Sequence, residues 1–199
     1  MNEAAAVQPS FEIRRVAIIG AGVAGRRFAL ACAGAGFHVV LEDVMPANLR
    51  KAEADFAECA DLSQRGTAGR LELALTVEDA VREADVAVDF VPDELESKLE
   101  IFSMIDRMAP PKTILCTPSY ALSITDLASC VYRPERCVAV RGKLFRGDAA
   151  EVPVARLLYP AAVAGSTLAA VDKFLRALGV EVRRETDPEV PLLMKNAVM

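Results

Sequence analysis

The fold is decided by the stretch Val16-Ala-Ile-Ile-Gly-Ala-Gly-Val-Ala-Gly25, in which an apolar run leads directly into three closely spaced glycines. The apolar part predicts a buried strand, and residues 23–35 have the length and composition of a helix that follows it. In this strand–turn–helix context, G-x-G-x-x-G spacing is typical of a loop that binds the phosphates of a dinucleotide. Gly20 permits the tight turn, Gly22 the close approach of backbone to phosphate, and Gly25 the packing of helix against sheet.

An acidic residue completes this pattern at the end of the next apolar run. Asp43 follows residues 39–41 at the expected distance of about 20 residues from the glycines. Its carboxylate can accept hydrogen bonds from both hydroxyls of an adenosine ribose and would repel a 2′-phosphate, so we expect NAD(H) rather than NADP(H). Glu42 would face the other way on an extended strand and is the second choice. The alternative is a glycine turn in a domain of the same fold that binds no nucleotide.

Short apolar runs alternate with longer amphipathic segments along the rest of the chain. We expect strands at residues 16–20, 39–41, 71–75, 86–91, 113–116, 137–140, 155–158 and 180–183. We expect helices at residues 23–35, 47–62, 76–83, 95–108 and 166–178, with a short one capped by Ser123. This alternation predicts an α/β protein with a Rossmann-type, doubly wound and mostly parallel sheet, helices on both faces, and six parallel strands followed by extra ones.

The domain organisation follows from the same pattern. Residues 1–12 are expected to form a flexible leader, residues 13–187 a dinucleotide-binding domain, and residues 188–199 an apolar tail. An apolar segment at a chain end favours contact with a partner or with a second copy of the chain.

Composition narrows the classes of function. The 199 residues carry a formal net charge of −5, which argues against a nucleic-acid partner. One histidine and five cysteines without C-x-x-C spacing argue against a metal site or a disulfide framework and favour free thiols in a reducing compartment. The sequence shows neither a signal peptide nor an apolar run long enough to cross a membrane, so we expect a cytoplasmic protein with no membrane contact.

Several segments together resemble the NAD-binding domain of the L-3-hydroxyacyl-CoA dehydrogenase family. They are the glycine loop and residues 39–43, 88–98, 122–128 and 133–136, and the similarity extends over about residues 13–185. The resemblance implies that Asp93 and Lys98 flank the nicotinamide side of NAD. With the glycine loop, the implied cofactor-binding residues are Gly20, Gly22, Val23, Ala24, Gly25, Asp43, Val91, Pro92, Asp93, Lys98 and Pro118.

The catalytic positions of that family are replaced in this chain. The family transfers a hydride between NAD and the C3 hydroxyl of an acyl-CoA, using a histidine base that a glutamate orients and a serine and an asparagine that bind the substrate oxygen. Here the base position holds Arg141, the glutamate position aligns with Arg156, and the serine position holds Tyr120. Asn196 is only a loose match for the asparagine, and the single histidine, His38, lies in the second strand, where a structural role is expected. Because arginine stays protonated at any working pH, Arg141 cannot serve as the base.

Two hypotheses follow. The chain is either an NAD-dependent enzyme of the 3-hydroxyacyl-CoA dehydrogenase type or a non-catalytic NAD(H)-binding module that docks a partner. The resemblance also implies that the family's helical C-terminal domain is absent. Because the family's catalytic positions are replaced, the sequence assigns no catalytic residue.

A basic cluster is expected around the carboxyl end of the sixth strand, at Arg133, Arg136, Arg141, Lys143 and Arg146. It is either a solvated loop or a site for an acyl-CoA or another anionic small molecule. The candidate substrate residues are Tyr120, Arg141 and Lys143, and the alternative to a histidine base is Tyr120 acting as the acid/base with its pKa tuned by the charge of Lys143.

Overall fold

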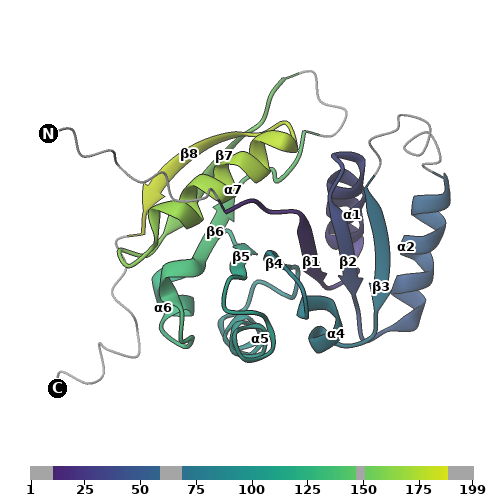
Figure 1. The fold of residues 1–199 in the computed structure, drawn as a ribbon, viewed down its shortest axis with the longest axis horizontal. Helices are drawn as coiled ribbons and strands as arrows, with labels where there is room; N and C mark the ends of the chain where they lie inside the picture. Colours follow the sequence, from purple (N-terminus) through teal and green to yellow (C-terminus); the bar gives the residue numbers. More distant parts are fainter. Residues whose placement is uncertain (1–10, 59–68, 147–150, 188–199) are drawn as a thin grey trace, which may run out of the picture.

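A computed structural model describes residues 11–58, 69–146 and 151–187 of the chain. It contains one eight-stranded sheet with the order β3-β2-β1-β4-β5-β6-β7-β8 (Figure 1). The strands are β1 (Arg15–Ile19), β2 (His38–Glu42), β3 (Arg70–Ala74), β4 (Val86–Asp89), β5 (Ile114–Pro118), β6 (Cys137–Arg141), β7 (Val154–Tyr159) and β8 (Glu181–Thr186). The helices are α1 (Val23–Gly34), α2 (Pro46–Glu58), α4 (Val77–Val81), α5 (Leu95–Met108), α6 (Ile124–Ala128) and α7 (Gly165–Ala177), with a 3₁₀ turn, η1, at Pro134–Arg136.

The strand directions confirm the predicted fold class. Strands β1 to β6 are mutually parallel, β7 runs antiparallel to β6, and β8 runs parallel to β7. The chain leaves β1 toward β2 and β3 and returns on the other side of β1 to form β4, so the strand order reverses between β1 and β4. In doubly wound sheets, ligands bind in the crevice at the carboxyl ends of the strands at this reversal.

The helices cover both faces of the sheet and bury a separate apolar core on each face. Apolar residues of α1, α2 and α7 pack on one face, and those of α4, α5 and α6 pack on the other (Figure 1). Because β1, β4, β5 and β6 are covered on both sides, they read as continuous apolar runs rather than as alternating patterns. The side chains of Thr76 and Ser123 accept hydrogen bonds from the third residue of α4 and α6, as their sequences predict.

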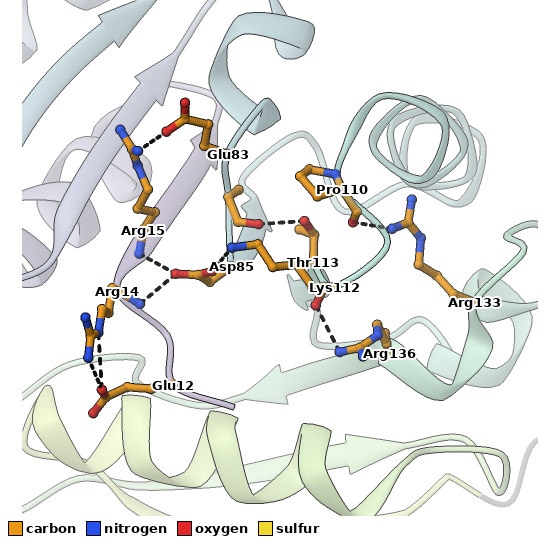
Figure 2. Close-up of polar contacts among 11 residues, drawn as sticks. Glu12, Arg14, Arg15, Glu83, Asp85, Pro110, Lys112, Thr113, Arg133 and Arg136 are labelled. Carbon is orange, nitrogen blue, oxygen red and sulfur yellow. Dashed lines mark hydrogen bonds and ion pairs between the residues drawn. The ribbon is translucent and has the colours of Figure 1, made fainter. Parts of the chain in front are cut away.

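Polar contacts tie the strands together at the amino edge of the sheet (Figure 2). Asp85, just before β4, accepts hydrogen bonds from the backbone N–H groups of Arg14 and Arg15, each 2.9 Å long, and pairs with Lys112 at 2.6 Å. The hydroxyl of Thr113 donates to the carbonyl of Ala84 at 2.6 Å. These contacts fix the start of β1, β4 and β5 in register, on the side opposite the glycine loop.

The predicted leader and tail fall mainly outside the described residues. Of the leader, Phe11 and Glu12 are described: Phe11 lies beneath the guanidinium of Arg136, and Glu12 pairs with Lys173 at 2.5 Å. Asp187, the last described residue, accepts hydrogen bonds from the hydroxyl of Ser123 and from the backbone N–H of Thr125 in the first turn of α6. Residues 188–199 and the predicted extension of α2 to residue 62 lie outside the described part of the chain.

Candidate functional site

The glycine loop adopts the conformation that its spacing predicts. Gly20 has a φ of 99°, in the region that favours glycine, and so turns the chain sharply out of β1. A Cβ added to Gly25 would lie 1.9 Å from the carbonyl oxygen of Gly20, so only glycine lets α1 approach the loop this closely. A Cβ added to Gly22 would meet no atom within 4 Å, which leaves open space beside the backbone where α1 begins.

Asp43 is positioned against this loop. Its Oδ2 accepts the backbone N–H of Ala21 at 2.8 Å and the amide of Asn48 at 3.1 Å, and its Oδ1 accepts the N–H of Met45 at 2.8 Å. Three donors from two segments hold the carboxylate in one orientation, and Oδ1, which accepts one hydrogen bond, keeps capacity for a further donor. Glu42 belongs to the opposite side of β2, because successive side chains of a strand alternate between its faces. The geometry thus favours Asp43 over Glu42 as the ribose ligand.

These residues fit a dinucleotide. Among the described residues no side chain caps the first turn of α1, so its N–H groups point from the helix terminus toward the open space beside Gly22. Unpaired N–H groups at the positive end of a helix dipole are a binding site for phosphate. A pyrophosphate at residues 22–24 with a ribose on Asp43 is therefore compatible with the loop as it stands.

A cleft of about 510 Å³ continues from the loop toward β4, β5 and β6. It brings together seven of the residues that the sequence singles out: Val23, Ala24, Val91, Asp93, Pro118, Tyr120 and Lys143. The remaining lining residues are Arg27, Phe90, Gly142, Leu144 and Phe145. The cleft therefore joins predicted cofactor residues to predicted substrate residues, while Pro92, Lys98 and Arg141 do not line it.

Asp93 fastens one wall of the cleft to the next loop. Its carboxylate accepts the backbone N–H of Tyr120 at 3.0 Å. Although partial burial opposes ionisation, hydrogen bonds from Ser119 and Tyr120 and the charge of Lys98 keep the pKa of Asp93 below its usual range. Asp93 is therefore a carboxylate whose charge is directed at the loop that follows β5.

Lys98 lies beneath the cleft rather than in its wall. Its side chain is 1% exposed and its Nζ lies 2.6 Å from the carboxylate of Asp89, which is fully buried. The same nitrogen donates to the carbonyl oxygen of Pro118 at 3.4 Å. Lys98 thus links α5 to the ends of β4 and β5, and direct contact of this side chain with NAD stays a prediction.

The two residues that the resemblance implies stand at the positions of the family's base and its orienting glutamate face each other. Arg141 ends β6 and pairs with Arg156 of β7 in the antiparallel register. Directly opposed residues share one face of a sheet, about 5 Å apart, so the aligned catalytic pair is a pair of arginines here. Arg141 donates to the carbonyl of Leu122 at 3.1 Å, and Arg156 pairs with Glu185 at 3.3 Å.

His38 and the described cysteines have structural positions. His38 begins β2, at the edge of the sheet away from the glycine loop, and its Nε2 lies 3.3 Å from Glu72. Cys116 is buried in the core, and burial raises the pKa of its thiol to about 12, so it is no nucleophile. Across residues 11–58, 69–146 and 151–187, no group of three or more His, Cys, Asp or Glu side chains could hold a metal ion. Within the same ranges, no helix is long and apolar enough to span a membrane.

The prediction of a basic cluster at the carboxyl end of β6 is wrong for two of its five residues. Arg133 and Arg136 precede β6 and lie at its amino end, whereas Arg141 lies at its carboxyl end. Arg133 pairs with Asp106 at 2.5 Å, and Arg136 donates to the carbonyl of Lys112 at 2.9 Å (Figure 2 shows both arginines). Closeness in sequence predicts one cluster, but the five residues of β6 separate Arg133 and Arg136 from the cations that follow the strand.

Comparison with known proteins agrees with this geometry. The family model described as 3-hydroxyacyl-CoA dehydrogenase, NAD binding domain, matches residues 15–141. This chain belongs to that family. Its cofactor is accordingly NAD, and the matched region ends at Arg141, which the resemblance implies is the base position.

Relatives of this NAD-binding domain are longer dehydrogenases. A probable 3-hydroxybutyryl-CoA dehydrogenase of Bacillus subtilis is 31% identical over 139 residues, which cover 65% of this chain and 48% of that protein. The 5-formyl-3-hydroxy-2-methylpyridine 4-carboxylate 5-dehydrogenase of Mesorhizobium japonicum is 28% identical over 198 residues, covering 94% of this chain and 62% of that protein. A crystal structure of (S)-3-hydroxybutyryl-CoA dehydrogenase from Ralstonia eutropha superposes with a TM-score of 0.75 at 24% identity, covering 88% of this chain and 64% of that one, which shows the shared fold.

Proposed function

We propose that this chain is an NAD(H)-binding module in which the cofactor-binding half of a 3-hydroxyacyl-CoA dehydrogenase is kept and its histidine-based catalysis is lost. The single observation that carries the proposal is the contact between the carboxylate of Asp43 and the backbone N–H of Ala21. This contact supports Asp43 as a ribose acceptor beside a loop whose spacing is typical of pyrophosphate binding. Val91, Asp93 and Pro118 then line the cleft in which the nicotinamide would lie.

Hydride transfer to NAD requires a group that removes the hydroxyl proton of the substrate. NAD, when bound, supplies the hydride acceptor, and this chain's own residues must supply the base. Arg141 and Arg156 occupy the positions of the family's base and orienting acid, and neither can accept a proton. The proposed module therefore binds the cofactor without oxidising a 3-hydroxyacyl-CoA by the family's mechanism.

The second candidate function is a dehydrogenase with a different base acting on a 3-hydroxyacyl-CoA-like anion. The observation that favours it is the presence of Tyr120 and Lys143 in one cleft. Tyr120 is 78% exposed, and no hydrogen bond joins it to Lys143 among the described residues, so a substrate would have to bring the two side chains together. The named relatives of this chain act on anionic compounds, which agrees with a cationic residue at that place.

A cytoplasmic location and docking of a partner through residues 188–199 remain part of the proposal.

Isothermal titration of the full chain with NADH tests the binding function. We expect Asp43→Asn and Asp43→Ala to weaken NADH binding by about tenfold to a hundredfold, because hydrogen bonds to a charged acceptor contribute about 1.5–3 kcal/mol each. The matched control is Asp79→Asn, which changes an exposed carboxylate at the start of α4 that pairs with Arg82. Absence of NADH binding by the unmodified chain would contradict the proposal.

A steady-state assay with acetoacetyl-CoA and NADH separates the two candidate functions. A pure binding module gives no turnover. Turnover that disappears in Tyr120→Phe while NADH affinity is retained would establish the second function. Turnover that survives Tyr120→Phe and Lys143→Gln would refute both the loss of the catalytic base and the proposed replacement.

A further inference from the structure

Two cations in the cleft have no carboxylate partner among the described residues. They are Arg27, on the second turn of α1, and Lys143, two residues after β6. The neighbouring Arg26, in contrast, pairs with Asp55 at 2.9 Å and also donates to the carbonyl of Ala21. Both side chains are exposed, and two exposed cations that line one cleft of a chain with a net charge of −5 raise the local concentration of anionic ligands there.

The sheet order places these cations on the two flanks of the cleft. The strands run β1-β4-β5-β6, so the helix after β1 and the segment after β6 enclose the ends of β4 and β5. Asp93 lies between the flanks, but its carboxylate accepts the N–H of Tyr120 and thus faces the loop after β5. A ligand between the flanks would therefore meet positive charge on each side.

The walls between the cations are apolar, with Phe90, Val91, Pro118, Leu144 and Phe145 lining them. Apolar walls lower the local dielectric once a ligand displaces water, which strengthens attraction between the cations and an anion. The whole cleft measures about 510 Å³ and must also admit the nicotinamide end of the cofactor. The remaining space suits a short carbon skeleton rather than a bulky one.

We infer that the cleft binds a small organic carboxylate between Arg27 and Lys143, beside the bound dinucleotide. The guanidinium of Arg27 matches a carboxylate in a bidentate geometry, and the ammonium of Lys143 adds a point charge from the other flank. The inference rests on the proposed NAD(H)-binding function and names the class of its second ligand. The competing source of negative charge is the pyrophosphate of the cofactor itself, which Arg27 would reach if its side chain turned toward the start of α1.

The test uses the full chain saturated with NADH and titrated calorimetrically with 3-hydroxybutyrate and with pyridine-4-carboxylate. The methyl ester of each acid serves as the neutral probe of the same skeleton. We expect at least one acid to bind tenfold or more tightly than its ester, and Arg27→Gln and Lys143→Gln each to weaken that acid by about tenfold. Arg176→Gln and Lys51→Gln, which remove the same charges from exposed helix positions outside the cleft, are the matched controls.

Each other outcome overturns the inference in a recognisable way. Failure of both acids to bind the NADH complex, or equal binding of acid and ester, removes the carboxylate site and leaves the cofactor function intact. A loss of NADH affinity in Arg27→Gln assigns that guanidinium to the pyrophosphate and refutes the two-cation site. Failure of NADH itself to bind the unmodified chain overturns the proposed function, and the carboxylate site with it.

Discussion

Replacing Glu42 by glutamine should change how the stability of the fold depends on pH. Glu42 ends β2, its side chain is 3% exposed, and its Oε1 has no hydrogen-bond partner among the described residues. Burial, with a smaller contribution from the charge of neighbouring Asp43, raises the pKa of the Glu42 carboxyl from 4.5 to about 7. The folded chain therefore favours the neutral acid where the unfolded chain carries a carboxylate.

The size and sign of the effect follow from this difference. Each pKa unit corresponds to about 1.4 kcal/mol, so the shift of Glu42 from 4.5 to about 7 costs the folded state about 3 kcal/mol once the carboxyl is ionised. Between those two pH values the folded chain holds a proton that the unfolded chain has released. The free energy of unfolding therefore falls as the pH rises toward 7, and the loss is complete above that pH.

Glutamine has nearly the shape of the neutral acid and cannot ionise, so Glu42→Gln removes the pH-dependent cost. We expect the difference in unfolding free energy between the variant and the unmodified chain to grow by about 2–3 kcal/mol, in favour of the variant, as the pH rises from 5 to 8. For a chain of this size that change corresponds to about 4–12 °C in midpoint temperature. Urea and thermal unfolding of both proteins at pH 5, 6, 7 and 8 measure the difference. Glu181→Gln makes the same change at an exposed position and serves as the control. A stability difference between Glu42→Gln and the unmodified chain that stays constant with pH would refute the reasoning, since an unsatisfied buried amide alone gives such an offset.

Three further changes test other parts of the structure. Gly25→Ala should destabilise the fold by about 1–3 kcal/mol and weaken NADH binding at least tenfold, because the added methyl would lie 1.9 Å from the carbonyl oxygen of Gly20. Thermal unfolding and NADH titration that match those of the unmodified chain would contradict the tight packing. Lys98→Met should lower the free energy of unfolding in urea by about 3–5 kcal/mol, because it leaves the buried carboxylate of Asp89 unpaired. The double variant that also carries Asp89→Leu should recover most of that stability, and no recovery would show that the ion pair is not the cause. Asp85→Ala should lower the free energy of unfolding by about 2–4 kcal/mol, because two backbone amides lose their acceptor. The NADH affinity of the folded protein should stay unchanged, and a parallel loss of affinity would contradict the separation of the two edges of the sheet.

The fold could be predicted closely because its strongest signals are local. Buried parallel strands appear as continuous apolar runs, and the glycine spacing fixes the first strand–turn–helix unit, so the sheet follows from the order of elements. Boundaries were less accurate where no apolar pattern marks them. The last strand was expected at residues 180–183 but is β8, Glu181–Thr186, because a polar edge strand is defined by its pairing with β7 rather than by its own sequence.

The site could be predicted where one residue contacts one loop, and not where distant segments converge. Asp43 was identified from spacing alone, since the turn after β1 and the end of β2 are adjacent in any sheet of this kind. The sequence places Arg27 near the start of the nucleotide helix but does not show that it lines the same cleft as Lys143. Lys98 was predicted to contact the cofactor, but a single sequence does not show that Asp89, nine residues earlier, neutralises it in the core.

The predicted cofactor residues and the two arginines at the aligned catalytic positions lie on separate elements, so a change at one set leaves the contacts of the other intact. The glycine loop and Asp43 belong to β1, α1 and β2, and their contacts to each other do not involve β6 or β7. Arg141 and Arg156 belong to β6 and β7, where each has a hydrogen-bond or ion-pair partner of its own. Replacing the catalytic pair therefore costs the nucleotide site none of its contacts. The same separation means that restoring histidine and glutamate at these two positions should leave NADH affinity unchanged, so any activity gained would report on the base alone.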